Sequence, residues 1–481
     1  MLFTEPTFLF LFLPILLALY FLKRPHAAYA NWLLLIASGI FYAKGGGAFT
    51  WLMLGSILFN YWMAIGVERA KEHSPSRAKS FVAAAVAINL IVLGIFKYAN
   101  FFGDNVNALV EAFHGSPLTL PRILLPIGIS FFTFHAISYV VDVYRGDATA
   151  QKSPVHAALY LLLFPQLIAG PIIRYRMIAD QLARRTVTLE DFAEGVRRFV
   201  IGLGKKVLIA NIVAGPADRI FSTPTAQLDA SHAWLGIVCY TLQIYFDFSG
   251  YSDMAIGLGR MFGFRFPENF RWPYIADTVQ EFWRRWHMSL SSWFRDYVYV
   301  PLGGSRVSPA RMYRNLVTVF FLCGLWHGAS WNFVIWGLFH GAFLVVERLG
   351  LAARIRRLWA PLRHAYLLLV VMVGWVFFRA DTLRGAVGFL GAMFGLADAT
   401  QPTPFTLAFY LTPELWLALV AGVIGSAPIV PAIARWREAF TNRWRGAGLD
   451  AMATTALMFI LVASIMQMAA RTYNPFIYFR F

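Results

Sequence analysis

Charged residues are scarce in this sequence. Asp, Glu, Lys and Arg make up 14% of its 481 residues, whereas hydrophobic residues make up 58%. Soluble domains carry roughly 25% charged residues, so this composition excludes an ordinary water-soluble or disordered protein. The mean hydropathy of +0.57 and the long apolar runs indicate a protein that crosses a membrane several times.

Cysteines, linkers and common catalytic signatures are also lacking. Cys239 and Cys323 are the two cysteines, and their positions inside apolar runs provide neither a disulfide framework nor a metal-ligand spacing. We therefore expect no metal site. No Ser/Gly-rich linker divides the chain, which predicts a single domain over residues 1–481. No internal repeat is visible, and no GxSxG, HExxH, Walker or Rossmann signature occurs in a suitable context.

Acidic residues are fewer than basic ones. The sequence contains 25 Asp and Glu and 42 Lys and Arg, which gives a net charge of +17. The basic residues do not form a stripe with base-stacking aromatics, so we expect no nucleic-acid partner. They gather in connections such as 68–79, whereas the segment 99–121 is poor in them. By the positive-inside rule the N-terminus lies outside, and the apolar run 8–22 is a retained first span rather than a cleaved signal.

The apolar pattern predicts an all-α, polytopic integral membrane protein of about 11 to 13 membrane helices with re-entrant segments. Residues 159–176 are apolar but contain Pro165, Gly170 and Pro171, so this stretch is either a broken segment lining a cavity or a Pro-kinked span. The candidate membrane segments are 7–22, 28–43, 48–67, 80–96, 123–144, 159–176, 190–212, 233–248, a hairpin over 315–349, 365–378, 386–396, 405–424 and 452–470.

Charges also occur within the apolar segments. The basic residues of 190–212, among them Arg198, Lys205 and Lys206, are expected to snorkel toward lipid headgroups. Asp247 and Asp253 flank Gly250, where they could cap helix ends or bind an arginine.

His327 is the leading catalytic candidate. It lies in GLWHGASW, in the middle of the apolar hairpin, and an ionisable residue at membrane depth is a functional candidate by default. Trp326 and Trp331 would wall the site, and an imidazole can accept a hydroxyl proton near neutral pH, as O-acyl transfer requires. The alternative is a histidine hydrogen-bonded between helices.

His287 lies 40 residues earlier, in WRRWHMSLSSWFRDY, and could hydrogen-bond an acyl carbonyl in the same cavity. An interfacial histidine is an equal alternative on sequence grounds. The candidates for substrate binding are Trp283, Arg284, Arg295, Trp326 and Trp331. Arginine recognises phosphate, although membrane anchoring explains the two arginines as well.

Two further intramembrane histidines, His135 and His340, are expected to be structural or to line a pore. On an unbroken helix, the spacing from His327 to His340 would place these two residues on different faces.

These motifs together resemble the membrane-bound O-acyltransferase (MBOAT) family, in particular its bacterial alginate O-acetyltransferase (AlgI) type. The resemblance runs from the first span to the last residue, with core motifs over about 125–345. The motifs that show the resemblance include LPIGISFFTFHAISYVVDVYRG (125–146), EFWRRWHMSLSSWFRDYVYVPLGGSR (281–306), GLWHGASWNFVIWGLFHG (324–341) and YNPFIYFRF (473–481).

The resemblance implies a fold with a central pore or funnel in the bacterial cytoplasmic (inner) membrane. It implies transfer of an acyl group, in the first place acetyl, from a cytoplasmic thioester such as acetyl-CoA toward a cell-surface polysaccharide such as alginate, with no bound cofactor. It maps the essential histidine to His327 and a second motif histidine to His287. It also implies a periplasmic or membrane-anchored SGNH-like acetyltransferase or esterase as partner.

Two other functions stay open at this point. D-alanyl transfer to teichoic acid would use related chemistry, whereas a transporter or channel would use the broken segments as a pathway without chemistry.

Overall fold

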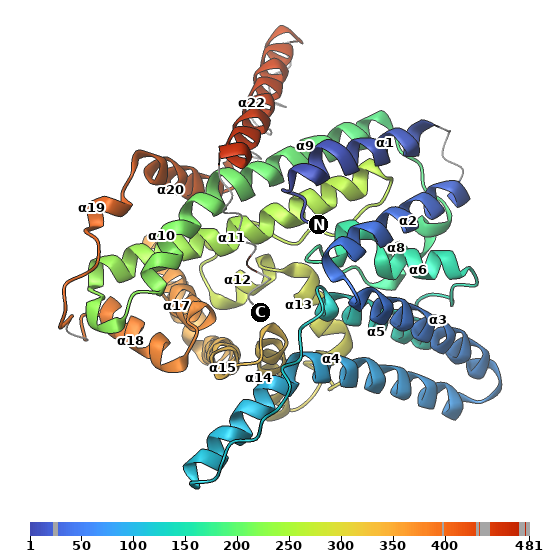
Figure 1. Ribbon diagram of the computed structural model, residues 1–481, viewed down its shortest axis with the longest axis horizontal. Coiled ribbons are helices and arrows are strands. Elements are labelled where there is room, and N and C mark those ends of the chain that lie inside the picture. The colour runs from blue at the N-terminus through green and yellow to red at the C-terminus, as the bar shows by residue number, and fades with distance from the viewer. Residues whose placement is uncertain (23–26, 397–398, 430–431, 433–442, 471–476, 478–481) are drawn as a thin grey trace. The chain divides into compact units, whose positions relative to one another are not determined.

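A computed structural model describes residues 1–22, 27–396, 399–429, 432, 443–470 and 477 (Figure 1). These residues form helices and no strand. Six of their helical segments are long and apolar enough to cross a membrane, and three shorter apolar helices accompany them. The prediction of an all-α, polytopic membrane protein is confirmed, while the number of 11 to 13 membrane helices stays a prediction.

The described residues form two compact units. Unit 1 comprises Met1–Val196 and Ala255–Pro267, and unit 2 comprises Arg197–Met254 and Glu268–Phe481. Two of the boundaries fall inside long helices rather than in linkers. The single domain over 1–481 stays a prediction.

Unit 1 is built from the N-terminal helices, in which α3 packs against both α4 and α5. Its elements are η1 (Phe8–Phe12), α1 (Leu13–Leu22), α2 (Ala27–Gly46), α3 (Phe49–His73), α4 (Pro75–Ala112), α5 (Ile129–Arg145), α6 (Pro154–Leu162), α7 (Phe164–Leu167), α8 (Tyr175–Ala183) and the first half of α9 (Leu189–Gly204).

The predicted break within 159–176 is present, because α6 ends at Leu162 and residues 168–174 are not helical. Neighbouring side chains satisfy the freed backbone there. The Ile173 N–H donates to His135 Nε2 at 3.1 Å, and the Tyr160 hydroxyl donates to the Ile173 carbonyl at 2.9 Å. This bond gives His135 a structural role, as membrane-embedded irregular backbone requires.

Two predicted spans of unit 1 have different bounds in the structure. The span expected over 123–144 begins only at Ile129, because Gly128 at its N-cap has a φ of +75° and Pro126 precedes it. The span expected over 80–96 belongs to the much longer α4.

Unit 2 holds the remaining helices, among which α14 and α15 form a tight hairpin. Its elements are the second half of α9, η2 (Lys205–Ala210), α10 (Asn211–Phe221), η3 (Thr225–Gln227), most of α11 (Ala230–Met261), η4 (Pro273–Ile275), α12 (Val279–Arg285), α13 (Met288–Phe294), η5 (Arg295–Tyr299), α14 (Pro309–His327), α15 (Trp331–Val346), η6 (Glu347–Leu351), α16 (Ala352–Ile355), α17 (Ala360–Arg379), α18 (Leu383–Met393), α19 (Leu407–Tyr410), α20 (Pro413–Gly425) and α22 (Arg443–Ala470).

Charges within α9, η2 and α11 pair with one another and with Glu268, which follows α11 in the sequence, and we call this group the charge cluster. The expected snorkelling of Arg198, Lys205 and Lys206 is wrong, because carboxylates within the protein pair with these cations. The capping role considered for the two aspartates is also wrong, since both lie within α11. The arginine pairing is confirmed for Asp253, whereas Asp247 pairs with a lysine. The pairs are Arg198–Asp253 (2.8 Å), Arg198–Glu268 (2.5 Å), Lys205–Asp253 (2.7 Å) and Lys206–Asp247 (2.7 Å).

Candidate active site around His327 and His287

The α14–α15 hairpin fixes the position of His327, which is the last residue of α14. A Cβ on Gly324 would overlap the carbonyl oxygen of Phe333, and one on Gly337 would overlap that of Phe320. The two backbones therefore touch where a side chain would keep them apart. The turn itself is shorter than expected, because α14 continues through Gly324 and only residues 328–330 connect the helices.

The His327 ring is buried among aromatic rings. Its centroid lies 4.8 Å from that of Trp326, 5.0 Å from that of Trp336 and 5.0 Å from that of Phe378, with interplanar angles between 70° and 84°. Edge-to-face contacts of this kind restrict a ring without using its nitrogens. The packing therefore restricts the orientation of the imidazole.

His287 connects α12 to α13 and has a φ of +43°, in the left-handed region that few side chains adopt. Asn269 holds this strained residue in place. Its carbonyl accepts from the Met288 N–H at 2.9 Å, and its Oδ1 accepts from the N–H (3.2 Å) and hydroxyl (2.9 Å) of Ser289. Strain that the surroundings stabilise is common at functional sites.

The His287 ring packs against the rings of Phe248, Phe270 and Trp326. Its centroid lies 4.6 Å from that of Phe248, and neither ring nitrogen has a hydrogen-bond partner among the described residues. Burial lowers the pKa of His287 to about 3, so the ring is neutral at pH 7. A neutral imidazole can donate one hydrogen bond and accept one.

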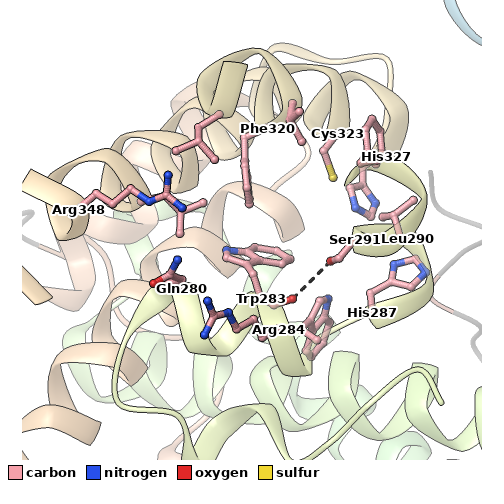
Figure 2. Close-up of a pocket in the computed structure, with 15 residues that line it drawn as sticks. Gln280, Trp283, Arg284, His287, Leu290, Ser291, Phe320, Cys323, His327 and Arg348 are labelled. Atoms are coloured by element: carbon pink, nitrogen blue, oxygen red, sulfur yellow. Dashed lines mark hydrogen bonds between the residues drawn. The ribbon is translucent and has the colours of Figure 1, made fainter. Parts of the chain in front are cut away.

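His287 and His327 line the same cavity of about 230 Å³ (Figure 2). Trp326 packs against both, since its ring centroid lies 6.2 Å from that of His287. The two histidines stand at one end of the cavity in the figure, while Arg284 and Arg348 stand at the other. The cavity thus joins two histidine rings to a cationic end.

Three of the five predicted substrate-binding residues belong to this site. Trp283 and Arg284 line the cavity, and Trp326 supports its histidine end. The buried Trp283 indole N–H has no partner among the described residues and is available to a ligand. Arg295 and Trp331 do not line the cavity. Arg295 is exposed and pairs with Asp296 at 2.7 Å, and Trp331 begins α15 with an exposed ring.

His340 lies behind the wall of the cavity rather than in it. Its ring centroid is 5.0 Å from that of Trp283 and 5.2 Å from that of Trp336, which also contacts His327. The turn between α14 and α15 breaks the helix that would have put His327 and His340 on different faces. The two histidines therefore share a neighbour, a relation that spacing on one helix did not predict.

A second cavity, of about 270 Å³, adjoins the first and shares Gln280 and Arg284 with it. We call it the arginine cavity. Four arginines and His364 line it against two carboxylates, Asp277 and Glu281. The arginines are Arg284, Arg285, Arg356 and Arg363. Cations therefore outnumber acids, as an anionic ligand would require.

Several residues of the site gave no signal in the sequence. Asn269 acts across 20 positions on Ser289, and Trp336 looked like one of many aromatic residues in an apolar helix. Only tertiary contacts distinguish them. No three His, Cys, Asp or Glu side chains come together to hold a metal ion among the described residues.

The sequence profile of the membrane-bound O-acyltransferase family matches residues 129–378. The chain is 44% identical to the probable alginate O-acetylase AlgI of Azotobacter vinelandii, over all of both chains. It is 38% identical to a peptidoglycan O-acetyltransferase of Helicobacter pylori, over 82% of this chain and 80% of the relative. A teichoic acid D-alanyltransferase of Bacillus subtilis is 29% identical over 60% of this chain and 73% of its own. The chain belongs to the membrane-bound O-acyltransferase family.

Proposed function

We propose that this membrane O-acyltransferase takes an acetyl group from a cytoplasmic acyl thioester, in the first place acetyl-CoA, and passes it on for O-acetylation of a cell-surface polysaccharide such as alginate. The observation that carries the proposal is the cavity with two buried histidines at one end and arginines at the other. The full-length similarity to a probable alginate O-acetylase supports the choice of polymer.

In the proposed reaction His327 acts as the general base. It removes the proton of the attacking hydroxyl while the oxygen forms a bond to the thioester carbonyl carbon. The carbon–sulfur bond then breaks, and the leaving thiolate takes the proton from His327. The products are an acetyl ester and a thiol, so no further reactant is needed.

His287 is proposed to stabilise the carbonyl oxygen during this step. A neutral imidazole can donate one hydrogen bond to the oxygen as negative charge develops on it, and the dry aromatic surroundings make such a bond stronger than it would be in water. The unpartnered nitrogens of His287 support this role. Trp283 offers a second donor from the same wall.

The arginine cavity supports a donor that carries phosphate. One guanidinium group can donate two parallel hydrogen bonds to two oxygens of a phosphate. Arg284 lines both cavities and so connects the two. A long thioester could thus place its phosphates in the arginine cavity and its acyl carbon near the histidines.

The proposed setting is the bacterial inner membrane, with the N-terminus in the periplasm and the donor on the cytoplasmic side. The alternation of basic and non-basic connections supports this orientation. Because a surface polymer lies outside the membrane, we propose that a periplasmic or membrane-anchored SGNH-like acetyltransferase or esterase completes delivery.

Purified full-length protein incubated with acetyl-CoA and an oligosaccharide acceptor that carries free hydroxyls tests the proposal. We expect thiol release that falls at least 100-fold in His327→Ala, because the attacking hydroxyl loses its base. His73→Ala, which removes an exposed histidine of α3, is the matched control and should match the parent protein.

The same assay separates the other functions. A D-alanyl thioester on a phosphopantetheine carrier should be a poorer donor than acetyl-CoA, and the reverse order would favour D-alanyl transfer. A transporter or channel would release no thiol, so a parent protein without turnover would contradict the proposal.

A further inference from the structure

The two cavities meet at helix α12. Gln280 and Arg284 of this helix line both cavities, and Arg348, which follows α15, lines the first cavity as well. Figure 2 shows these three side chains together at the end of the cavity away from the two histidines. Two elements, α12 and the segment after α15, thus form the walls of the cationic end.

A helix as short as α12 depends on its surroundings for its position. It has seven residues, and isolated helices shorter than about 12 residues are marginal in water. Gln280 and Arg284 are four residues apart, so they lie on the same face and move together with the helix. The contacts of α12 therefore decide where its cavity-lining face lies.

Ring packing and a backbone bond hold the middle and the C-terminal end of α12. The Trp283 ring centroid lies 5.6 Å from that of Trp336 on α15, and the Arg285 carbonyl accepts from the Arg271 N–H at 3.0 Å. The first turn, which carries Gln280, lies before both contacts. Its position depends on the groups that bind its backbone N–H groups, because these have no partner within the helix.

Glu347 binds two of these N–H groups. Its Oε1 accepts from the Val279 N–H at 2.7 Å, and its Oε2 accepts from the Gln280 N–H at 3.0 Å. The Tyr366 hydroxyl of α17 donates to Oε1 at 3.2 Å. Glu347 is buried, and a carboxylate at the N-terminus of a helix is favourable. One side chain at the end of α15 thus connects α12 and α17.

The backbone around Glu347 departs from an ordinary helix. Glu347 begins the π-helical turn η6 directly after α15, and Gly350 in this turn has a φ of +126°, which side chains rarely adopt. Single π-helical turns are frequent at functional sites. Arg348 follows Glu347 in the same turn. The residue that binds α12 and the arginine that lines the cavity therefore belong to one element.

We propose that Glu347 is a positioning residue for the acyl donor. Its carboxylate sets the distance between Arg284 on α12 and Arg348 on η6, so that both arginines can reach the phosphates of one donor molecule. Glu347 itself lines neither of the two cavities and acts through α12. This inference rests on the proposed function, because it concerns the placement of a phosphate-bearing thioester.

Positioning and simple stabilisation have different consequences. If Glu347 only stabilised the fold, its loss would affect every donor equally, because every donor uses the same cavity. If it places the arginines, its loss affects donors that carry phosphate and spares donors without phosphate.

Glu347→Gln tests the proposal with two thioester donors. The amide keeps the length of the side chain, but its nitrogen cannot accept from an N–H, so one of the two bonds to α12 is lost. We expect KM for acetyl-CoA to rise about tenfold, while kcat stays within about twofold. KM for acetyl-pantetheine, which has the thioester but no phosphate, should stay within about twofold as well.

Two further variants serve as comparisons. Thr412→Ala removes the 3.2 Å bond from the Leu415 N–H at the start of α20, and it should leave KM for both donors unchanged because α20 lines neither cavity. Tyr366→Phe removes the third bond to Glu347 and keeps the two bonds to α12. It should raise KM for acetyl-CoA in the same direction, by about two- to threefold.

An unchanged KM for acetyl-CoA in Glu347→Gln, or an equal rise in KM for both donors, would overturn the proposal. If Glu347→Gln does not fold, an unchanged KM for acetyl-CoA in Tyr366→Phe would overturn it instead.

Calorimetric titration with CoA and with pantetheine, the two thiols without an acyl group, measures the same effect without turnover. The parent protein should bind CoA at least about tenfold more tightly than pantetheine, and Glu347→Gln should lose most of this difference. The same ratio of affinities in both proteins would contradict the positioning role alone. A parent protein that releases no thiol from acetyl-CoA would contradict the proposed function, and the titration would still test Glu347.

Discussion

Unit 2 contains two regions with buried polar side chains, the charge cluster and the cavity region, and they differ in whether these side chains have partners within the protein. In the charge cluster each cation pairs with a carboxylate at 2.5 to 2.8 Å. In the cavity region the nitrogens of His287 and the indole N–H of Trp283 have no partner among the described residues. A buried polar group without a hydrogen-bond partner lowers the stability of the fold. Only the cavity region carries this cost, and a ligand that hydrogen-bonds to these groups would remove it.

The comparison suggests opposite responses to mutation. Removing a partner in the charge cluster should damage folding, whereas removing a polar group beside the cavity should damage turnover and leave folding unchanged. Four substitutions test this contrast, from the largest expected effect to the smallest.

Asp247→Ala should have the largest effect. It leaves the buried Lys206 ammonium without its carboxylate and removes an acceptor of the Ile477 N–H at 2.8 Å. Breaking a buried pair from one side costs about 3–5 kcal/mol. Thermal unfolding in detergent should show a large drop in midpoint.

The double variant Lys206→Met with Asp247→Leu is its control, because it removes both charges and should regain most of the lost stability. Equal unfolding midpoints for Asp247→Ala and the parent would show that the pair is not structural.

His287→Ala should act in the opposite way. We expect thiol release to fall about 100-fold, the usual effect of losing one donor to a developing oxyanion, with an unchanged unfolding midpoint. His287→Asn keeps an N–H donor and tolerates the left-handed backbone, so it should regain part of the activity. A fall in stability without a fall in turnover would place His287 among the structural residues.

Asn269→Ala tests whether the strained backbone of His287 needs its support. The substitution removes both bonds from Ser289 to the amide oxygen and the bond from the amide to Ser252 at 2.9 Å. We expect kcat to fall about tenfold with little change in KM, because a misplaced donor weakens transition-state binding only.

Ser252→Ala removes a single one of these bonds and should have a smaller effect on kcat. A change in KM alone, with kcat preserved, would argue against a positioning role for Asn269.

The sequence predicted the centre of the site better than its edges. His327 and His287 lie in recognisable motifs, and both line the cavity. Spacing left a structural role open for each, and the resemblance to a family singled them out. Arg295 and Trp331 share the same motifs but lie outside the cavity, because motif membership does not tell which way a side chain points.

Hydropathy located most helices but misjudged α4 and the charge cluster. The segment after residue 96 contains Asn100, Asp104 and Asn107, which lower its hydropathy, although contacts with residues 118–123 stabilise it as helix. The lysines and arginine of α9 and η2 looked like interfacial anchors because their carboxylate partners lie about 50 residues away in sequence. Both errors concern polar groups whose partners come from tertiary structure.

Arg356→Gln tests the same contrast in the arginine cavity and should have the smallest effect of the four substitutions. Arg356 lines this cavity, and it should contribute one of several phosphate contacts, so we expect KM for acetyl-CoA to rise about threefold while kcat is kept. Acetyl-pantetheine, which has the thioester but no phosphate, serves as the internal control, and its KM should not change. An equal rise in KM for both donors would mean that Arg356 has a structural role and does not bind phosphate. The arginine cavity would then resemble the charge cluster rather than the site of His327.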